Sequence, residues 1–206
     1  MKLKIIAYSS FTSKGISKNG GLLFANEEKY GFKELAKHIY KQTNSEYPKF
    51  FKMDELCKLA FLTTEVLLKD ETLSRNEDGA DIAVILANKD ASVVSDSRHA
   101  ETLIDRETSF PSPAVFVYTL PNIMLGEICI RHQITGENTC FIMESFNSDF
   151  MFEYIKNLFK KEGYQYCITG WVNYTVGEYS ARLCLISKDG SDGNNLKEFK
   201  RGFNKI

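Results

Sequence analysis

Hydrophobic and polar residues alternate along this chain with two different periods. Five short segments have the apolar pattern of strands: Lys2–Tyr8, Asp81–Asn88, Thr139–Met143, Tyr166–Asn173 and Tyr179–Ser187. A run that is apolar throughout, such as DIAVILAN at Asp81–Asn88, is typical of a strand buried on both faces. The last two segments flank a turn at Val176–Glu178, so we expect them to form an antiparallel pair.

Other segments carry apolar residues every three or four positions, which predicts amphipathic helices. They are Glu28–Gln42, Met53–Lys69, Ser95–Asp105, Asn122–Arg131 and Ser148–Lys161. Asp54, in the first turn of the second of these helices, suits the positive end of the helix dipole. The polar stretch Ser9–Asn26 is expected to be a loop, and Lys188–Asn195 is expected to be a polar tail.

The order of these elements predicts an α/β fold. Strands that alternate with helices are typical of a three-layer unit, with helices on both faces of a mostly parallel sheet, here of five strands. The chain has 206 residues and no internal repeat, so we expect a single domain at 1–206. A domain of this size buries about 70% of the surface that its unfolded chain exposes.

Composition narrows the classes of function. Lys and Arg number 26 against 27 Asp and Glu, which does not favour a basic nucleic-acid-binding face. No apolar run reaches the roughly 20 residues of a membrane span, and the N-terminal MKLKIIAYSSF is interpreted as a strand instead of a signal peptide. The five cysteines form no CxxC pair, so no disulfide framework or metal site is expected. We expect a cytoplasmic protein without a cofactor.

Three segments carry a family resemblance: SPAVFVYTLPNIMLGEICIRHQITGENTCFIMES at Ser112–Ser145, FFKMDELCKLAFLTTEVLL at Phe50–Leu68 and YQYCITGWVNY at Tyr164–Tyr174. They resemble the β-ketoacyl synthase branch of the thiolase-like condensing enzymes. In that family a Pro-Asn pair opens a helix that ends near Ile-Arg-His, and a Gly-x-Asn strand then leads to a nucleophilic cysteine. The resemblance covers nearly the whole chain but only the N-terminal half of a typical condensing enzyme. It implies one thiolase-like three-layer half.

Counting from Gly136 along the family pattern puts the nucleophile at position 145, where this chain has Ser145. The family's thiolate is stabilised by a helix N-terminus, and two histidines of the second half, which is not present here, support its chemistry. A serine hydroxyl needs an adjacent general base, and Glu144 would oppose a developing negative charge. We therefore interpret Ser145 as a residue that fills a turn or caps the next helix; the alternative is an acyl-accepting nucleophile.

Four further residues were considered as candidates for chemistry. Cys140 lies five residues before Ser145 within the expected strand, where its side chain would be packed. His132 follows Arg131 at a helix end, where positive charge is favourable, so a structural role is expected. His99 is interpreted as an exposed helix residue, near the family's interface loops, and His38 carries no functional signal.

The helix after Ser145 has apolar residues over a wide arc between Phe150 and Phe159, broader than a surface helix needs. We expect either a partner that covers this face or a local rearrangement that does so. The favoured function is a non-catalytic ketosynthase-like subunit of a fatty-acid, polyketide or pigment pathway. It would form a homodimer, or a heterodimer with a ketosynthase, or bind an acyl carrier protein. The alternatives are an acyltransferase or thioester hydrolase that uses Ser145, and a remnant without a present partner.

Overall fold

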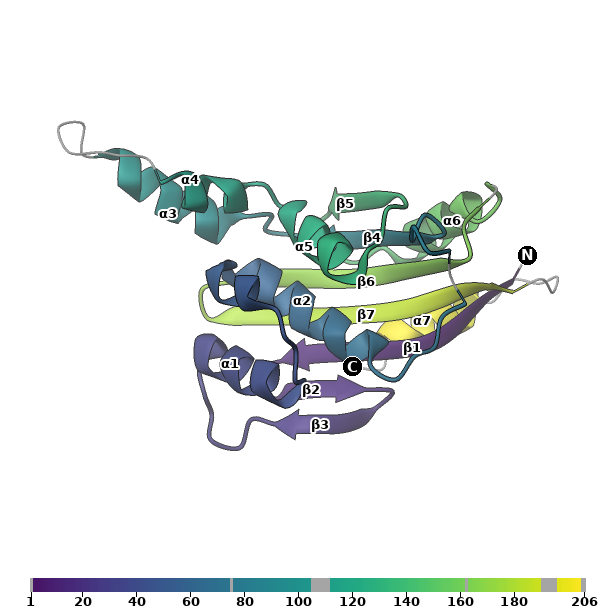
Figure 1. Ribbon diagram of the computed structural model, residues 1–206, viewed down its shortest axis with the longest axis horizontal. Helices are drawn as coiled ribbons and strands as arrows, with labels where there is room; N and C mark the ends of the chain where they lie inside the picture. Colours follow the sequence, from purple (N-terminus) through teal and green to yellow (C-terminus); the bar gives the residue numbers. More distant parts are fainter. Residues whose placement is uncertain (1, 75, 105–111, 162, 190–195, 205–206) are drawn as a thin grey trace.

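In the part of the chain that the computed structural model describes (2–74, 76–104, 112–161, 163–189 and 196–204), seven strands form one mixed sheet (Figure 1). Their order across the sheet is β3-β2-β1-β7-β6-β4-β5. The strands are β1 (Lys2–Thr12), β2 (Gly15–Lys18), β3 (Gly21–Ala25), β4 (Ile82–Asn88), β5 (Asn138–Ile142), β6 (Tyr166–Thr175) and β7 (Glu178–Asp189). Two edges therefore bound the sheet, one formed by β3 and the other by β5.

The expectation of a mostly parallel, five-stranded sheet is wrong. Only two of the pairings are parallel, β4 with β5 and β4 with β6, whereas β1–β2, β1–β7, β2–β3 and β6–β7 are antiparallel. The two extra strands come from Ser9–Asn26, which its polar composition had marked as a loop. Asn19 and Gly20 both have positive φ, 52° and 82°, which is the geometry of a two-residue hairpin turn between β2 and β3.

Helices cover both faces of the sheet, as expected. On one face lie α1 (Phe32–Gln42), α2 (Glu55–Leu68) and α5 (Ile123–His132), and on the other lie α6 (Ser148–Leu158) and α7 (Leu196–Asn204). The helices α3 (Val93–Ile104) and α4 (Pro113–Phe116) extend beyond the end of the sheet (Figure 1). Two short 3-10 helices, η1 (Pro48–Lys52) and η2 (Val117–Thr119), complete the described elements.

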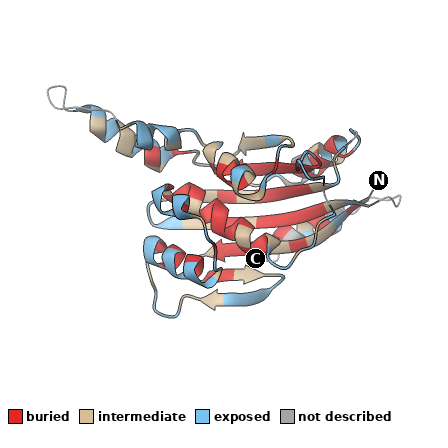
Figure 2. Cartoon of the chain, in the orientation of Figure 1, coloured by how far each residue is buried: buried red, intermediate tan, exposed pale blue. Residues whose placement is uncertain are grey.

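The strand β4 lies at the centre of the hydrophobic core, as its continuous apolar run predicted. All seven of its residues are buried (Figure 2). Because successive side chains of a strand point to opposite faces, Ile82, Val84 and Leu86 join the core under α2 and α5. Ala83 and Ile85 join the core under α6 and α7. The residue before α2, Asp54, is its N-cap and accepts a hydrogen bond of 2.8 Å from the Cys57 N–H.

The helix α7 was not predicted, and it covers the apolar face of α6. The Phe199 ring packs against Phe152 at 5.5 Å, and the Arg182 Nη1 donates to the Phe203 carbonyl at 2.6 Å. The buried side chains of α6 are Met151, Phe152, Ile155 and Leu158, and Phe159 after it is also buried. Of the two ways in which we expected this face to be covered, the structure shows the local one for most of it, while Phe150 remains 43% exposed. Of the expected tail, 188–189 belong to β7 and 190–195 lie outside the described residues.

Among the described residues, no single helix has both the length and the apolar character needed to cross a membrane. The segments Pro113–Thr119 and Ile123–His132 pass that test only when taken together, and they are bent by 98° relative to each other.

Candidate functional site

Ser145 lies in the loop between β5 and α6, at the carboxyl ends of the parallel strands β4 and β5. Open α/β sheets place their ligand sites at this end of parallel strands. The Ser145 side chain is exposed, and the loop is fixed by a 2.9 Å hydrogen bond from the Met143 N–H to the Asn88 carbonyl. Asn147, not Ser145, caps α6, because its side chain accepts a hydrogen bond from the Phe150 N–H at 3.0 Å. We expected Ser145 either to fill a turn or to cap the helix that follows. The cap is wrong, and Ser145 lies in the bend between β5 and α6.

The hollow beside Ser145 is lined by apolar side chains, by polar groups and by one carboxylate. It measures about 440 Å³ and is lined by Phe141, Ile142, Met143, Glu144, Ser145, Asn147 and Phe150. Its carboxylate, that of Glu144, lies 2.9 Å from the Lys89 Nζ. The hydrogen bond that Lys89 donates to Glu144 raises the pKa of Lys89, so this lysine stays protonated at neutral pH and cannot act as a base. No described histidine lines this hollow.

Two asparagines that the sequence analysis did not single out make the rim of this site rigid. The buried Asn88 side chain donates to the Val172 carbonyl at 2.6 Å and accepts from the Ala91 N–H. The Asn173 side chain accepts from the backbone N–H groups of Lys89 and Asp90, at 3.1 and 3.0 Å. These bonds hold the turn that follows β4, in which Ala91 has a φ of 49°. Their only sequence signal is an Asn at the end of each of two apolar strands.

Cys140 is packed within β5, as expected. It pairs in register with Leu86 of β4 and is half-buried. Burial raises the pKa of its thiol to about 11, so the reactive thiolate is scarce at neutral pH. Cys140 therefore has none of the features of an activated nucleophile.

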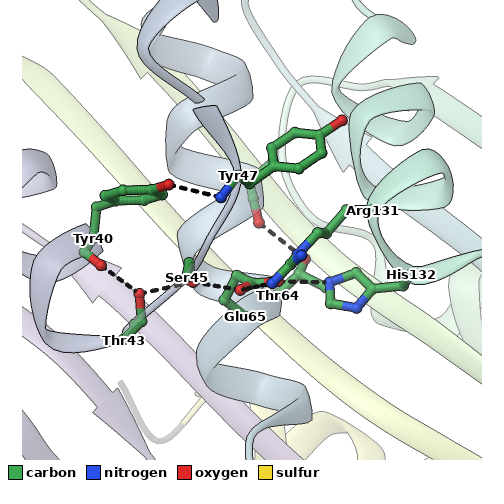
Figure 3. Close-up of polar contacts among 9 residues, drawn as sticks. Tyr40, Thr43, Ser45, Tyr47, Thr64, Glu65, Arg131 and His132 are labelled. Carbon is green, nitrogen blue, oxygen red and sulfur yellow. Dashed lines mark hydrogen bonds and ion pairs between the residues drawn. The ribbon is translucent and has the colours of Figure 1, made fainter. Parts of the chain in front are cut away.

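The pair Arg131 and His132 lies at the other end of β4 and binds Glu65 of α2 (Figure 3). The Arg131 Nε and Nη2 donate to the two Glu65 carboxylate oxygens at 3.0 and 3.2 Å, and the His132 Nε2 is 3.1 Å from Oε1. Burial alone would raise the pKa of Glu65, but the hydrogen bonds from His132, Arg131 and Ser45 outweigh it and lower the pKa to about 2. His132 thus takes part in a polar network between α5 and α2, which is consistent with the structural role expected for it.

The other two histidines do not line the hollow beside Ser145 either. His99, on α3, is half-buried instead of exposed, since its ring lies 5.4 Å from that of Phe116. His38, on α1, is exposed and stacks on Tyr30 at 4.6 Å. In the described ranges, no group of three or more His, Cys, Asp or Glu side chains is arranged to hold a metal ion.

Solved structures of ketosynthases and chain length factors resemble this architecture. The first, the ishigamide ketosynthase/chain length factor, has a TM-score of 0.68 and 14% identity over 93% of this chain and 63% of that chain. The second is the ketosynthase ApeO in complex with its chain length factor ApeC from Xenorhabdus doucetiae. Its TM-score is 0.61, with 11% identity over 92% of this chain and 80% of that chain.

A third structure is AntDE:AntF, a type II acyl-carrier protein in complex with its ketosynthase. Its TM-score is 0.60, with 9% identity over 90% of this chain and 62% of that chain. The chain has a thiolase-like fold. It spans less than two thirds of the ishigamide and AntDE:AntF chains that it matches. No protein-family model and no curated protein matches it.

Proposed function

We propose that this chain is a non-catalytic ketosynthase-like subunit that works beside an active condensing enzyme in a fatty-acid, polyketide or pigment pathway. One combination of observations supports the proposal. The thiolase-like fold extends over nine tenths of the chain, and the expected nucleophile position carries an exposed serine that donates no hydrogen bond to a base within the described residues. The fold is therefore present without the activated nucleophile that a condensing reaction needs.

The chemistry of the loop argues against the alternative, an acyltransferase or hydrolase that uses Ser145. A serine becomes nucleophilic when a neighbouring base removes its proton. Glu144 is the one carboxylate beside Ser145, and its side chain is 86% exposed and paired with Lys89 at 2.9 Å. Within the described residues, the Ser145 hydroxyl donates no hydrogen bond to this carboxylate or to a histidine, so the contact that would activate a serine nucleophile is not formed.

The free edge of β5 is where we place the partner subunit. An outer strand presents unpaired N–H and C=O groups, which readily pair with a strand of another chain. Apolar side chains flank this edge: Ile142 is 52% exposed and Phe150 is 43% exposed. A strand edge with exposed apolar neighbours is typical of a protein–protein interface.

A basic segment supports an additional contact with an acyl carrier protein. Between 29 and 52 the chain has six lysines and two glutamates, although its formal net charge is -1. Lys33 and Lys49 pair with Glu55 and Glu127. The remaining lysines are exposed and have no acidic partner among the described residues: Lys29, Lys37, Lys41 and Lys52. An acidic carrier protein would be steered toward this surface.

Intact-mass spectrometry after incubation with an acyl thioester separates the two functions. The subunit proposal predicts that the chain alone forms no adduct and gives no turnover. An adduct that forms on the wild type and disappears in Ser145→Ala, but persists in the neighbouring Ser148→Ala, would establish the enzyme instead. The partner is tested by size-exclusion chromatography with light scattering, using a ketosynthase encoded beside this chain. A chain that stays monomeric with and without that ketosynthase would overturn the proposal.

A further inference from the structure

A second hollow lies at the amino ends of β4 and β6, on the face covered by α2 and α5. It has a volume of about 560 Å³, within the range of roughly 300–1,000 Å³ that is usual for small-molecule sites. Its floor is aliphatic, because it is made by Ile82, Ile134 and Ile168, which are 0–5% exposed. Along β4, six residue steps of about 3.3 Å put this hollow about 20 Å from the carboxyl end near Ser145.

The rim of this hollow is polar but carries balanced charge. Arg131 lines it, and the Glu65 carboxylate neutralises its guanidinium. Glu71 also lines it, and the Lys18 Nζ lies 2.8 Å from its carboxylate. Two of the three Arg131 nitrogens bind Glu65, whereas Nη1 makes no hydrogen bond within the described residues. The rim therefore offers a hydrogen-bond donor without a net charge.

A chain of hydrogen bonds holds that donor in place (Figure 3). Ser45 donates to Glu65 and lies 2.9 Å from the Thr43 hydroxyl, which in turn donates to the Tyr40 carbonyl at 2.9 Å. The Arg131 guanidinium also lies over the Tyr47 ring, 5.6 Å from its centroid. Because Arg131 is fixed on two sides, little additional ordering is needed when a ligand binds.

The backbone beside the rim is equally constrained. Gln133, which ends α5 with a φ of 52°, lines the hollow. Gly79 packs against it so closely that a Cβ on Gly79 would lie 2.0 Å from the Gln133 carbonyl oxygen. This glycine also has a φ of 66°, which side-chain-bearing residues rarely adopt. The wall of the hollow is therefore built in advance of any ligand.

We propose that this hollow binds a small, uncharged amphipathic molecule. Its aliphatic part would lie on the isoleucine floor, and a carbonyl oxygen, such as that of an amide or ester, would accept a hydrogen bond from Arg131. Because the charges of the rim are balanced, a carboxylate or an ammonium group would lose its hydration on entering the hollow without gaining a net attraction in return. The site is separate from Ser145 and from the β5 edge, so it does not depend on the proposed function.

Titration of the isotope-labelled full chain with hexanamide, followed by amide chemical shifts, tests this site. We expect saturable shifts around 68–73 and 131–134, and binding at least about fivefold weaker for hexanoate and hexylamine, the charged analogues. Leu73→Trp should fill the hollow and abolish the shifts, whereas Leu103→Trp, a matched change at an exposed leucine of α3, should not. If Leu73→Trp does not fold, Thr72→Trp fills the same hollow.

Three results would overturn the proposal. The first is the absence of saturable shifts around the hollow with hexanamide. The second is equal binding of hexanoate, which would contradict an uncharged ligand. The third is unchanged binding in a folded Leu73→Trp or Thr72→Trp variant, which would place the hexanamide elsewhere. None of these results bears on whether the chain pairs with a ketosynthase.

Discussion

Replacing Glu65 by Gln should destabilise the protein and weaken its dependence on acidic pH. In the folded chain the pKa of Glu65 is about 2, against an ordinary value of 4.5. At about 1.4 kcal/mol for each pKa unit, this interval sets an upper limit of about 3.5 kcal/mol on the contribution of Glu65 to the free energy of unfolding. The side chain of Glu65 is only 9% exposed, but that of Arg131 is 29% exposed. Solvent screening therefore reduces the expected contribution to about 1–2 kcal/mol.

The sign of the pH effect follows from the direction of the pKa shift. Because folding lowers the pKa of Glu65, its contribution is fully present above about pH 4.5 and is lost as the pH falls toward about 2. Roughly half of it should already be lost at pH 3. In Glu65→Gln the group no longer titrates, so the wild type should lose more stability than the variant between pH 5 and pH 3.

Urea denaturation at pH 7, 5 and 3 measures these differences. Glu153→Gln is a suitable control, because Glu153 forms only a surface ion pair with Lys156, at 3.1 Å. This substitution should change the unfolding free energy by less than about 0.5 kcal/mol. The double variant with Arg131→Met isolates the coupling between the two groups. Equal stability of wild type and Glu65→Gln at pH 7, or parallel losses between pH 5 and pH 3, would refute this account of the Glu65 network.

Three further predictions follow from packing and exposure. Ile142→Lys, at the β5 edge, should weaken binding of a ketosynthase partner by about tenfold or more in biolayer interferometry. Leu22→Lys, on the opposite edge strand and 61% exposed, should leave that binding unchanged. Phe199→Ala, in the core between α6 and α7, should lower the unfolding free energy by about 3 kcal/mol in urea denaturation. Its control is Phe116→Ala, at a 54% exposed position, which should lower the unfolding free energy by less than about 1 kcal/mol. Cys140 should resist alkylation by iodoacetamide at pH 7.5 in the folded chain, because burial raises the pKa of its thiol to about 11, and it should react once the chain is unfolded in urea. Rapid labelling of the folded chain would contradict the packed position of Cys140.

The elements that the sequence predicted best are those whose burial is uniform. The apolar run of β4 is buried along its whole length, and α2 carries apolar residues around most of its circumference. A segment that is apolar on nearly all sides is stable only when it is buried in the core. Its type and approximate limits therefore follow from the sequence pattern alone. The expected helix at Met53–Lys69 differs from α2 by only two residues at its start and one at its end.

The elements that were missed depend on distant partners. The hairpin of β2 and β3 lies in a segment rich in Ser, Gly and Lys, and it becomes part of the sheet because β1 runs on to Thr12 and pairs with β2. Asn19-Gly20 was the one local signal for its turn. Among its described residues, the helix α7 has two buried aromatic side chains, Phe199 and Phe203. They are buried only because α7 packs against α6, where Phe199 contacts Phe152. Likewise, nothing near Arg131 in the sequence indicates that its partner is Glu65.

The position of α7 also decides between two ways in which a partner could approach. If the partner covered α6, it would have to displace α7, and loosening α7 by Phe199→Ala should then tighten the complex. If the partner pairs with β5, Phe199→Ala should leave the affinity for the ketosynthase unchanged, because the Phe199 ring is buried against Phe152 of α6 and is not part of the edge strand. We expect the second result, since the α7 contacts include the Arg182 bond to the Phe203 carbonyl and an ion pair between Lys200 and Asp149 at 2.7 Å. A complex that tightens in Phe199→Ala, with Ile142→Lys without effect, would move the interface from β5 to α6.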